Sequence, residues 1–177
     1  SFVLGQLIRQ QGRLLLRIES LERASSPADA LQAQGLPVGA PAPGFELSAL
    51  SGERLGLDLL LGETRGLVLI FSNPQCGPCA ALMPDVAAWQ GESAGPVRIA
   101  VITGGLESLN RAIADRHGLK DVLQDDGDMA QRYRVDGTPS AVLIRPDGTI
   151  GSRLAFGRDA IERLVLSSAG ESGHAVD

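Results

Sequence analysis

The chain has 177 residues, of which 44% are hydrophobic and 21% are charged, and its formal net charge is −5. This composition supplies one ordinary hydrophobic core and excludes a disordered or fibrous chain. Acidic balance and only six aromatic residues argue against a nucleic-acid partner, because phosphates need clustered basic surface and bases stack on aromatic rings. Two Cys and two His are too few for a structural zinc site or a four-cysteine iron–sulfur cluster, so we expect no metal and no cofactor.

Residues 1–23 carry a helical pattern with apolar side chains at heptad spacing. The seam consists of Leu7, Leu14, Ile18 and Leu21, and Gln11 is the polar exception in it. Two interpretations remain open: the helix lies on its own domain, or it is a stalk that pairs with a second copy as a weak homodimer. The apolar start at Ser1, which is not Met, favours a stalk beside a membrane anchor absent from this chain. Arginines at positions 9, 13 and 17 oppose an extracytoplasmic stalk, because arginine beside a span favours the cytoplasmic side.

A stretch rich in Pro and Gly, residues 24–44, cannot sustain a helix or a central strand. We expect an N-terminal helix and linker over 1–34, a folded domain over 35–167 and a flexible tail over 168–177. The predicted elements are a hairpin (45–47 and 54–57), a strand (66–72), a helix (76–90), a strand (97–103), a helix (106–117), a short helix (128–133), two strands (140–145 and 149–154) and a last helix (158–166). This order predicts an α/β sandwich with a mixed central sheet between helices.

Cys76 and Cys79 lie between a buried strand and a helix, with Gly77 and Pro78 between them. A thiolate at a helix N-terminus faces unsatisfied N–H groups and the positive end of the helix dipole, which lowers the pKa of the thiol. Cys76 is therefore the predicted exposed nucleophile, and Cys79, one turn into the helix, is the predicted shielded thiol that resolves the mixed disulfide. Half of a zinc site shared across a dimer and an inert structural disulfide are the alternatives. A C-x-x-C pair beside a βαβ pattern favours the redox interpretation.

These motifs resemble the thioredoxin-like superfamily, and within it the membrane-anchored redoxins of the TlpA and ResA type, over about residues 35–166. Residues 39–53 resemble that group's N-terminal hairpin, and Cys76-Gly77-Pro78-Cys79 carries the dipeptide typical of thioredoxin. Residues 133–140 resemble the loop with the family's cis-proline. The Phe-Ser-Asn-Pro-Gln-Cys approach and the arginine-bearing start resemble the methylamine-dehydrogenase accessory (MauD-like) branch. The resemblance implies a three-layer sandwich with an N-terminal β-hairpin extension and a separate N-terminal helix.

The resemblance also implies a substrate-binding loop around Thr138 and Pro139. A cis bond between them would turn the backbone beside the sulfurs and leave the main chain of Thr138 free to pair with a substrate strand. From the residues alone, a trans turn before a strand is the alternative. Gly77 and Pro78 are the other candidate substrate-binding residues.

Three positions depart from the family pattern. Gln75 stands where thioredoxins usually have Trp, Ile70 stands where thioredoxin has a buried Asp, and Leu82 stands where the ResA type has a Glu. The usual proton acceptor for Cys79 is therefore missing at both known positions.

The leading hypothesis is a thiol–disulfide oxidoreductase that exchanges electrons with protein thiols or disulfides, in the periplasm or otherwise outside the cytoplasm. A membrane electron donor is the expected second partner, and the Gly-Pro dipeptide favours a reductase. A maturation factor or chaperone dedicated to one client protein is the alternative. A peroxiredoxin is disfavoured because Leu69 and Asn73 stand where its motif before Cys76 needs Pro and Thr or Ser.

Overall fold

The structure is a computed structural model that describes residues 34–62, 64–92 and 97–170. The helix predicted over residues 1–23 lies outside these residues. From Gly35 on, the described residues belong to one compact unit. Its elements are β1 (Glu46–Ala49), β2 (Arg54–Gly56), α3 (Leu57–Leu61), β3 (Gly66–Ser72), α4 (Gly77–Glu92), β4 (Val97–Thr103), α5 (Glu107–His117), β5 (Val122–Gln124), α6 (Met129–Arg132), β6 (Ser140–Ile144), β7 (Ala155–Phe156) and α7 (Arg158–Gly170). Within the described part of the chain, no helix is long and apolar enough to cross a bilayer.

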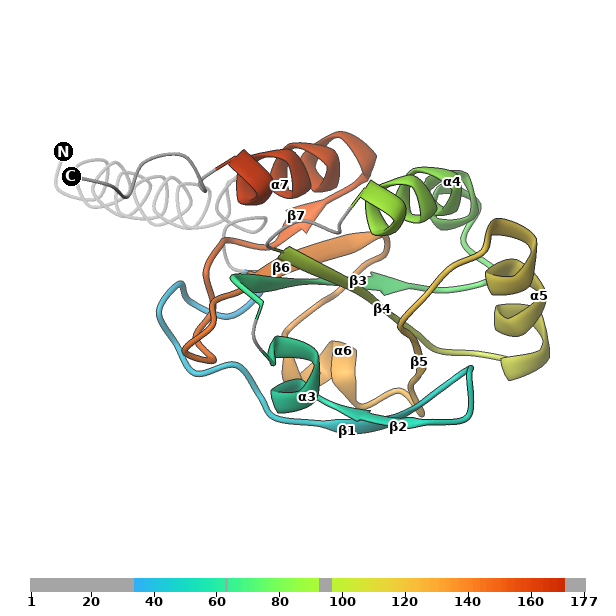
Figure 1. Cartoon of the computed structure of the whole chain (residues 1–177), viewed down its shortest axis with the longest axis horizontal. Coiled ribbons are helices and arrows are strands. Elements are labelled where there is room, and N and C mark those ends of the chain that lie inside the picture. Colours follow the sequence, from blue (N-terminus) through green and yellow to red (C-terminus); the bar gives the residue numbers. More distant parts are fainter. Residues whose placement is uncertain (1–33, 63, 93–96, 171–177) are drawn as a thin grey trace, which may run out of the picture. The chain divides into compact units, whose positions relative to one another are not determined.

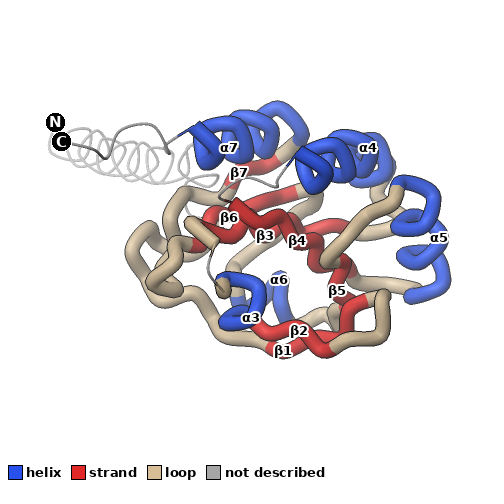
Figure 2. Tube along the Cα trace, viewed as in Figure 1, coloured by secondary structure: helices blue, strands red, loops and turns tan. Residues whose placement is uncertain are grey.

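The strands form one mixed sheet of seven strands in the order β2-β1-β5-β4-β3-β6-β7 (Figures 1 and 2). β3 and β4 run parallel, with Gly66 opposite Val97 and Ser72 opposite Thr103. β6 pairs antiparallel with the other side of β3, so β3 lies inside the sheet. The β1–β2 hairpin joins the sheet through antiparallel pairing of β1 with β5. The predicted mixed sheet with an N-terminal hairpin is thus confirmed.

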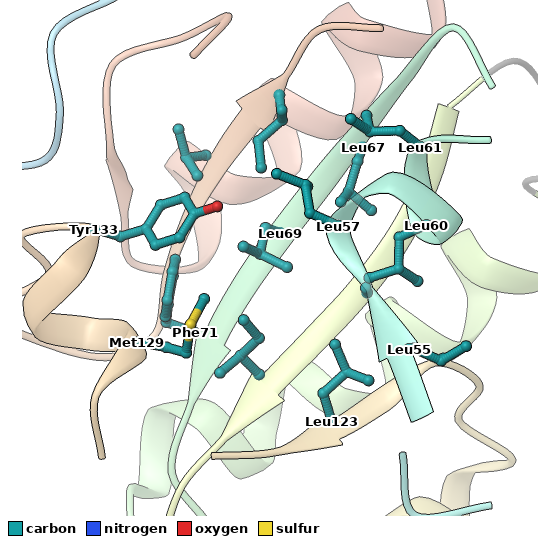
Figure 3. Packing of buried hydrophobic residues seen from close by; sticks show 14 of the residues in the cluster. Leu55, Leu57, Leu60, Leu61, Leu67, Leu69, Phe71, Leu123, Met129 and Tyr133 are labelled. Carbon is teal, nitrogen blue, oxygen red and sulfur yellow. The ribbon is translucent and has the colours of Figure 1, made fainter. Parts of the chain in front are cut away.

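Alternate side chains of β3 enter two separate cores, because neighbours along a strand point to opposite faces. Leu67, Leu69 and Phe71 pack with side chains of α3 and α6 (Figure 3). Val68 and Ile70 pack on the other face with side chains of α4, α5 and α7. Helices therefore cover both faces of the sheet, with α4 and α7 on one and α3 and α6 on the other (Figure 1). This double cover explains why β3 is a continuous apolar run in the sequence.

The segment before β1 is held to the domain by hydrogen bonds to distant loops. The N–H of Gly35 donates to the carbonyl of Arg134 at 2.8 Å, and the N–H of Gly39 donates to the carbonyl of Ile150 at 2.8 Å. The hydroxyl of Tyr133 donates to the carbonyl of Pro43 at 2.9 Å. Residues 35–44 of the predicted linker therefore belong to the folded unit. They lie before the first strand, yet their backbone groups form hydrogen bonds with the rest of the domain.

The last hairpin differs from the predicted continuous strand over 149–154. An isolated bridge pairs Ile144 with Ile150, and regular pairing with β6 resumes only where Ala155 lies opposite Ala141. Between these two pairs the chain advances by five residues from position 150 to 155 but by only three on β6, from 144 to 141. The strand that follows the turn therefore contains a bulge of two extra residues. Ser152 explains the break, because its hydroxyl accepts the N–H of Leu143 at 3.0 Å, where a backbone carbonyl would act in a regular ladder.

Other boundaries also depart from the sequence prediction. α3 and β5, which the sequence pattern did not predict, span five and three residues, too few to show a hydrophobic period. α7 extends to Gly170, four residues beyond its predicted end at Leu166. Its last turn contains Ser168, which is buried and whose hydroxyl donates to the carbonyl of Leu164 at 2.6 Å. Small polar residues show no hydrophobic periodicity that would predict a helix. Here the hydroxyl of Ser168 forms its hydrogen bond within the helix itself.

We expect Tyr133, the chain's one tyrosine, to resist ionisation in the folded protein. Burial raises its pKa above the ordinary value of about 10. As the pH rises, the unfolded chain therefore loses this proton before the folded protein does. The contribution of Tyr133 to the free energy of unfolding is complete below pH about 10. Above that pH it declines by up to about 1.4 kcal/mol per pH unit. Spectrophotometric titration of the native protein should show no phenolate at a pH where the unfolded chain is ionised.

Tyr133→Phe is the matched control for this titration. It should flatten the alkaline loss of stability, and it should cost about 1 kcal/mol at neutral pH because the hydrogen bond to Pro43 is lost. Denaturant unfolding at neutral and at alkaline pH measures both effects. The same alkaline slope in the two proteins would contradict the prediction.

Candidate active site

The predicted pair Cys76 and Cys79 forms a disulfide where β3 leads into α4. The two Cα atoms are 5.2 Å apart. The turn between the elements is closed by Asn73, whose side-chain oxygen accepts the N–H of Gln75 at 2.9 Å and whose carbonyl accepts the N–H of Cys76 at 3.1 Å. These bonds direct the chain into α4 and place Cys76 one residue before the helix begins at Gly77.

The two sulfurs have different surroundings. Cys76 is half-buried, whereas Cys79 is only 1% exposed. The backbone N–H of Cys79 donates to Sγ of Cys76 at 3.2 Å. The free N–H groups of the first turn and the positive end of the dipole of α4 favour negative charge at that sulfur. In the reduced protein this environment favours the thiolate form of Cys76.

The loop before β6 brings Thr138 to the disulfide. The Thr138–Pro139 peptide bond is cis, and the carbonyl oxygen of Thr138 lies 3.5 Å from Sγ of Cys76. Pro139 is buried and Thr138 is half-buried. The hydroxyl of Ser140, a fully buried residue, donates to the carbonyl of Gly137 at 2.5 Å and closes the loop. Sequence analysis missed this role of Ser140, whose one signal is its place directly after the proline.

The two positions at which the resembled family pattern would place a proton acceptor are apolar and inaccessible here. Ile70 and Leu82 are 0% exposed and belong to the same apolar cluster. Asp85 is the carboxylate of α4 whose side chain the structure describes, and it forms an ion pair with Arg158 of α7, with Nη2 and Oδ2 2.8 Å apart. It follows Cys79 by six residues, which at about 100° per residue turns it away from the sulfur. The side chains at positions 70 and 82 therefore cannot take a proton from Cys79.

A second loop, between β4 and α5, packs against the turn that precedes α4. A Cβ atom at Gly105 would lie 3.2 Å from Cγ of Pro74, and the φ of Gly105 is +77°, so this close approach requires glycine. The amide nitrogen of Asn110 donates to the carbonyl of Gly104, and that of Gln124 donates to the carbonyl of Gly105, each at 2.9 Å. No local sequence pattern identifies these two amides, because they converge on the loop only across the sheet.

The other predicted substrate-binding residues, Gly77 and Pro78, are exposed at the start of α4. The structure thus brings the cysteine pair and Thr138 together and leaves the start of α4 open to solvent. Among the described residues, no group of three or more His, Cys, Asp or Glu side chains could hold a metal ion.

Comparison with known proteins shows three kinds of similarity. A model of the AhpC/TSA family matches residues 38–153. The chain is 26% identical to the methylamine utilization protein MauD of Methylobacillus flagellatus over 157 residues, which are 85% of this chain and 74% of MauD. Its fold is similar to the thioredoxin domain of a thiol-disulfide oxidoreductase from Bacteroides vulgatus, with a TM-score of 0.66 and 17% identity over 76% of this chain and 99% of that domain.

A secreted disulfide oxidoreductase of Mycobacterium tuberculosis, homologous to E. coli DsbE, is also similar. Its TM-score is 0.57 and its identity is 25%, over 70% of this chain and 95% of the relative. These similarities confirm the predicted thioredoxin-like fold and the resemblance to redoxins and to MauD.

We expect Cys76 to be the fast-reacting thiol after reduction. Its sulfur is accessible and receives the N–H of Cys79, whereas Cys79 itself is covered. Brief treatment of the reduced protein with limiting iodoacetamide, followed by peptide mass spectrometry, should find the label on Cys76. Cys76→Ser should leave one slow thiol. Preferential labelling of Cys79 in the native protein would reverse the assignment of roles.

Proposed function

We propose that this chain, which belongs to the AhpC/TSA family and is a thioredoxin-like thiol–disulfide oxidoreductase, reduces disulfides in protein substrates outside the cytoplasm. The observation that carries the proposal is the disulfide at the start of α4, where the half-buried sulfur of Cys76 lies beside the carbonyl of Thr138. The reaction uses no metal and no organic cofactor.

The reaction consists of two thiol–disulfide exchanges. The thiolate of Cys76 attacks one sulfur of the substrate disulfide, that bond breaks, and the released substrate thiolate takes a proton. Cys79 then loses its proton, attacks Sγ of Cys76 and releases the second substrate sulfur. The substrate gains two electrons and the protein loses two. A membrane electron donor would return the Cys76–Cys79 disulfide to the dithiol.

The substrate-binding surface would comprise the loop at Thr138 and Pro139 on one side and Gly77 and Pro78 on the other. Thr138 is half-buried at the disulfide and its carbonyl points to the reacting sulfur. An extended substrate segment could pair with this backbone, as strands do when they add to an exposed edge. The Gly-Pro dipeptide favours the reductase direction.

The proposed location outside the cytoplasm rests on the secreted Mycobacterium tuberculosis relative. We infer that residues 35–167 form the catalytic domain and that residues 1–34 join it to a membrane anchor and support a weak homodimer.

A second candidate function is supported by the similarity to MauD. A factor dedicated to one client would use the same cysteine pair but discriminate strongly among substrates. A peroxidase is disfavoured although the chain belongs to the AhpC/TSA family, because Leu69 and Asn73 replace the Pro and Thr or Ser of the peroxiredoxin motif before Cys76.

Reduction of insulin by the pre-reduced protein tests the proposal. A general reductase should precipitate the insulin B chain, Cys76→Ser should abolish the reaction, and the protein without reductant should be inactive. Cys79→Ser cannot resolve its mixed disulfide, so its substrates should stay attached to Cys76 and be identifiable by mass spectrometry. Silence toward insulin together with a single trapped client would favour the dedicated factor. A Cys79→Ser protein that traps nothing would overturn both functions.

We expect the resolution step to depend on one ionisation only, that of the Cys79 thiol. Ile70 and Leu82 are buried and cannot titrate, so water or the leaving substrate thiolate must accept the proton. The rate of mixed-disulfide resolution, followed by stopped flow across the range from acid to alkaline pH, should rise with a single inflection. A second inflection would reveal another acid that takes part.

Leu82→Glu should add the missing inflection. Burial raises a carboxyl pKa, which brings the new group toward the range in which it can exchange protons near neutral pH. The change also costs stability, about 1–3 kcal/mol, because a polar group replaces a fully buried leucine. Leu82→Gln is the matched control, since it is polar but cannot titrate. An identical pH profile in the two variants would contradict the expectation.

A further inference from the structure

Phe156 lies at the edge of the sheet, directly beside the loop that approaches the disulfide. It belongs to β7, the last strand in the sheet order, and pairs with Ser140 of β6. The next residue, Gly157, donates its N–H to the carbonyl of Pro139 at 2.9 Å. The backbone at Phe156 is thus held beside the cis-proline loop by its pairing with Ser140 and by the hydrogen bond of Gly157.

The ring of Phe156 lies over Gly137. A Cβ atom at Gly137 would be only 2.9 Å from Cε2 of Phe156. Any larger residue at position 137 would therefore clash with the ring where it now lies. Gly137 is followed by Thr138, whose carbonyl lies 3.5 Å from Sγ of Cys76. The aromatic ring therefore flanks the backbone group that contacts the reacting sulfur.

Phe156 is nevertheless 50% exposed. Single exposed apolar residues are common in folded proteins and by themselves indicate no function. Phe156 differs from them because it lies beside the loop that approaches the disulfide. A substrate disulfide must reach bonding distance of Cys76, and consecutive residues of an extended segment advance by about 3.3 Å each. An extended segment that places its cysteine at Cys76 and pairs with the backbone of Thr138 would pass next to the ring.

We propose that Phe156 is a specificity-determining residue, whose exposed ring binds a large apolar side chain next to the cysteine of the substrate disulfide. The occupant is an extended segment of a substrate protein, because the ring is continuous with the surface that any substrate must cover. This inference rests on the proposed function. Contact between apolar side chains at one subsite changes discrimination by about tenfold or more.

The test uses the full chain, pre-reduced, and two synthetic peptide disulfides that differ only in the residue after the cysteine, Leu in one and Ser in the other. The second-order rate constant for reduction is measured for each peptide, and a small aromatic disulfide (Ellman's reagent) measures the chemistry without a peptide. Phe156→Ala removes the ring, and Phe156→Leu keeps an apolar surface. Leu59→Ala is the matched control, because Leu59 is 59% exposed and belongs to α3, which covers the face of the sheet opposite to α4 (Figure 1).

The wild type should prefer the Leu peptide by about tenfold, and Phe156→Ala should bring the two rates within about twofold. Phe156→Leu and Leu59→Ala should retain most of the preference, and Leu59→Ala should reduce the small disulfide at the rate of the wild type. A preference that survives in Phe156→Ala, or none in the wild type, would overturn the inference while leaving the proposed function intact. Failure of the wild type on the small disulfide and on both peptides would instead overturn the proposed function. Sedimentation of the wild type and of Phe156→Ala tests whether the ring instead contacts a second copy of the chain. If the wild type forms a dimer that Phe156→Ala does not form, and both prefer the Leu peptide equally, the inference is overturned.

Discussion

The antiparallel pairing of β3 with β6 is the constraint on which the site depends. Phe71 lies opposite Ser140 near the end of β3, so the chain that leaves β3 toward Cys76 and the chain that enters β6 from Thr138 meet at the same edge of the sheet. A shift of one residue in this register would move every side chain of β6 to the opposite face. Each face of the sheet packs its own set of these side chains, so the shift would replace every packed contact of β6. The distance between Cys76 and Thr138 is therefore set by the hydrophobic core.

The same core shapes the chemistry of the cysteine pair. Cys79 is 1% exposed, and Ile70 and Leu82 belong to the apolar cluster under α4, so neither position carries a group that could titrate. Negative charge is favoured at Cys76 instead, through the N–H of Cys79 and the start of α4. The protein thus separates an accessible sulfur that readily carries charge from a covered one that lacks a neighbouring proton acceptor. We therefore expect attack and resolution to proceed at unequal rates.

The rim of the site is built from backbone contacts as much as from side chains. Glycine at position 105 allows one loop to approach Pro74, and glycine at position 137 allows Phe156 to lie over the other. Hydrogen bonds from Asn110 and Ser140 hold these loops. A disulfide exchanger needs such a rim because the chemistry itself discriminates little, so selection among substrates depends on the surface around the reacting sulfur.

The sequence by itself determined the fold class, most of the long elements and the cysteine pair. Long apolar runs such as residues 66–72, and the C-x-x-C spacing at a helix start, are local patterns with a direct physical cause. The tertiary structure alone decided which distant groups meet. The bulge at Ser152, the amides of Asn110 and Gln124 at the glycine loop, and the ring of Phe156 over Gly137 join residues that are far apart along the chain or depend on strand pairing. The period of the hydrophobic residues shows which face of a helix or strand is buried. It does not show which partner a polar group or an exposed ring contacts, because that depends on how the sheet brings separate loops together.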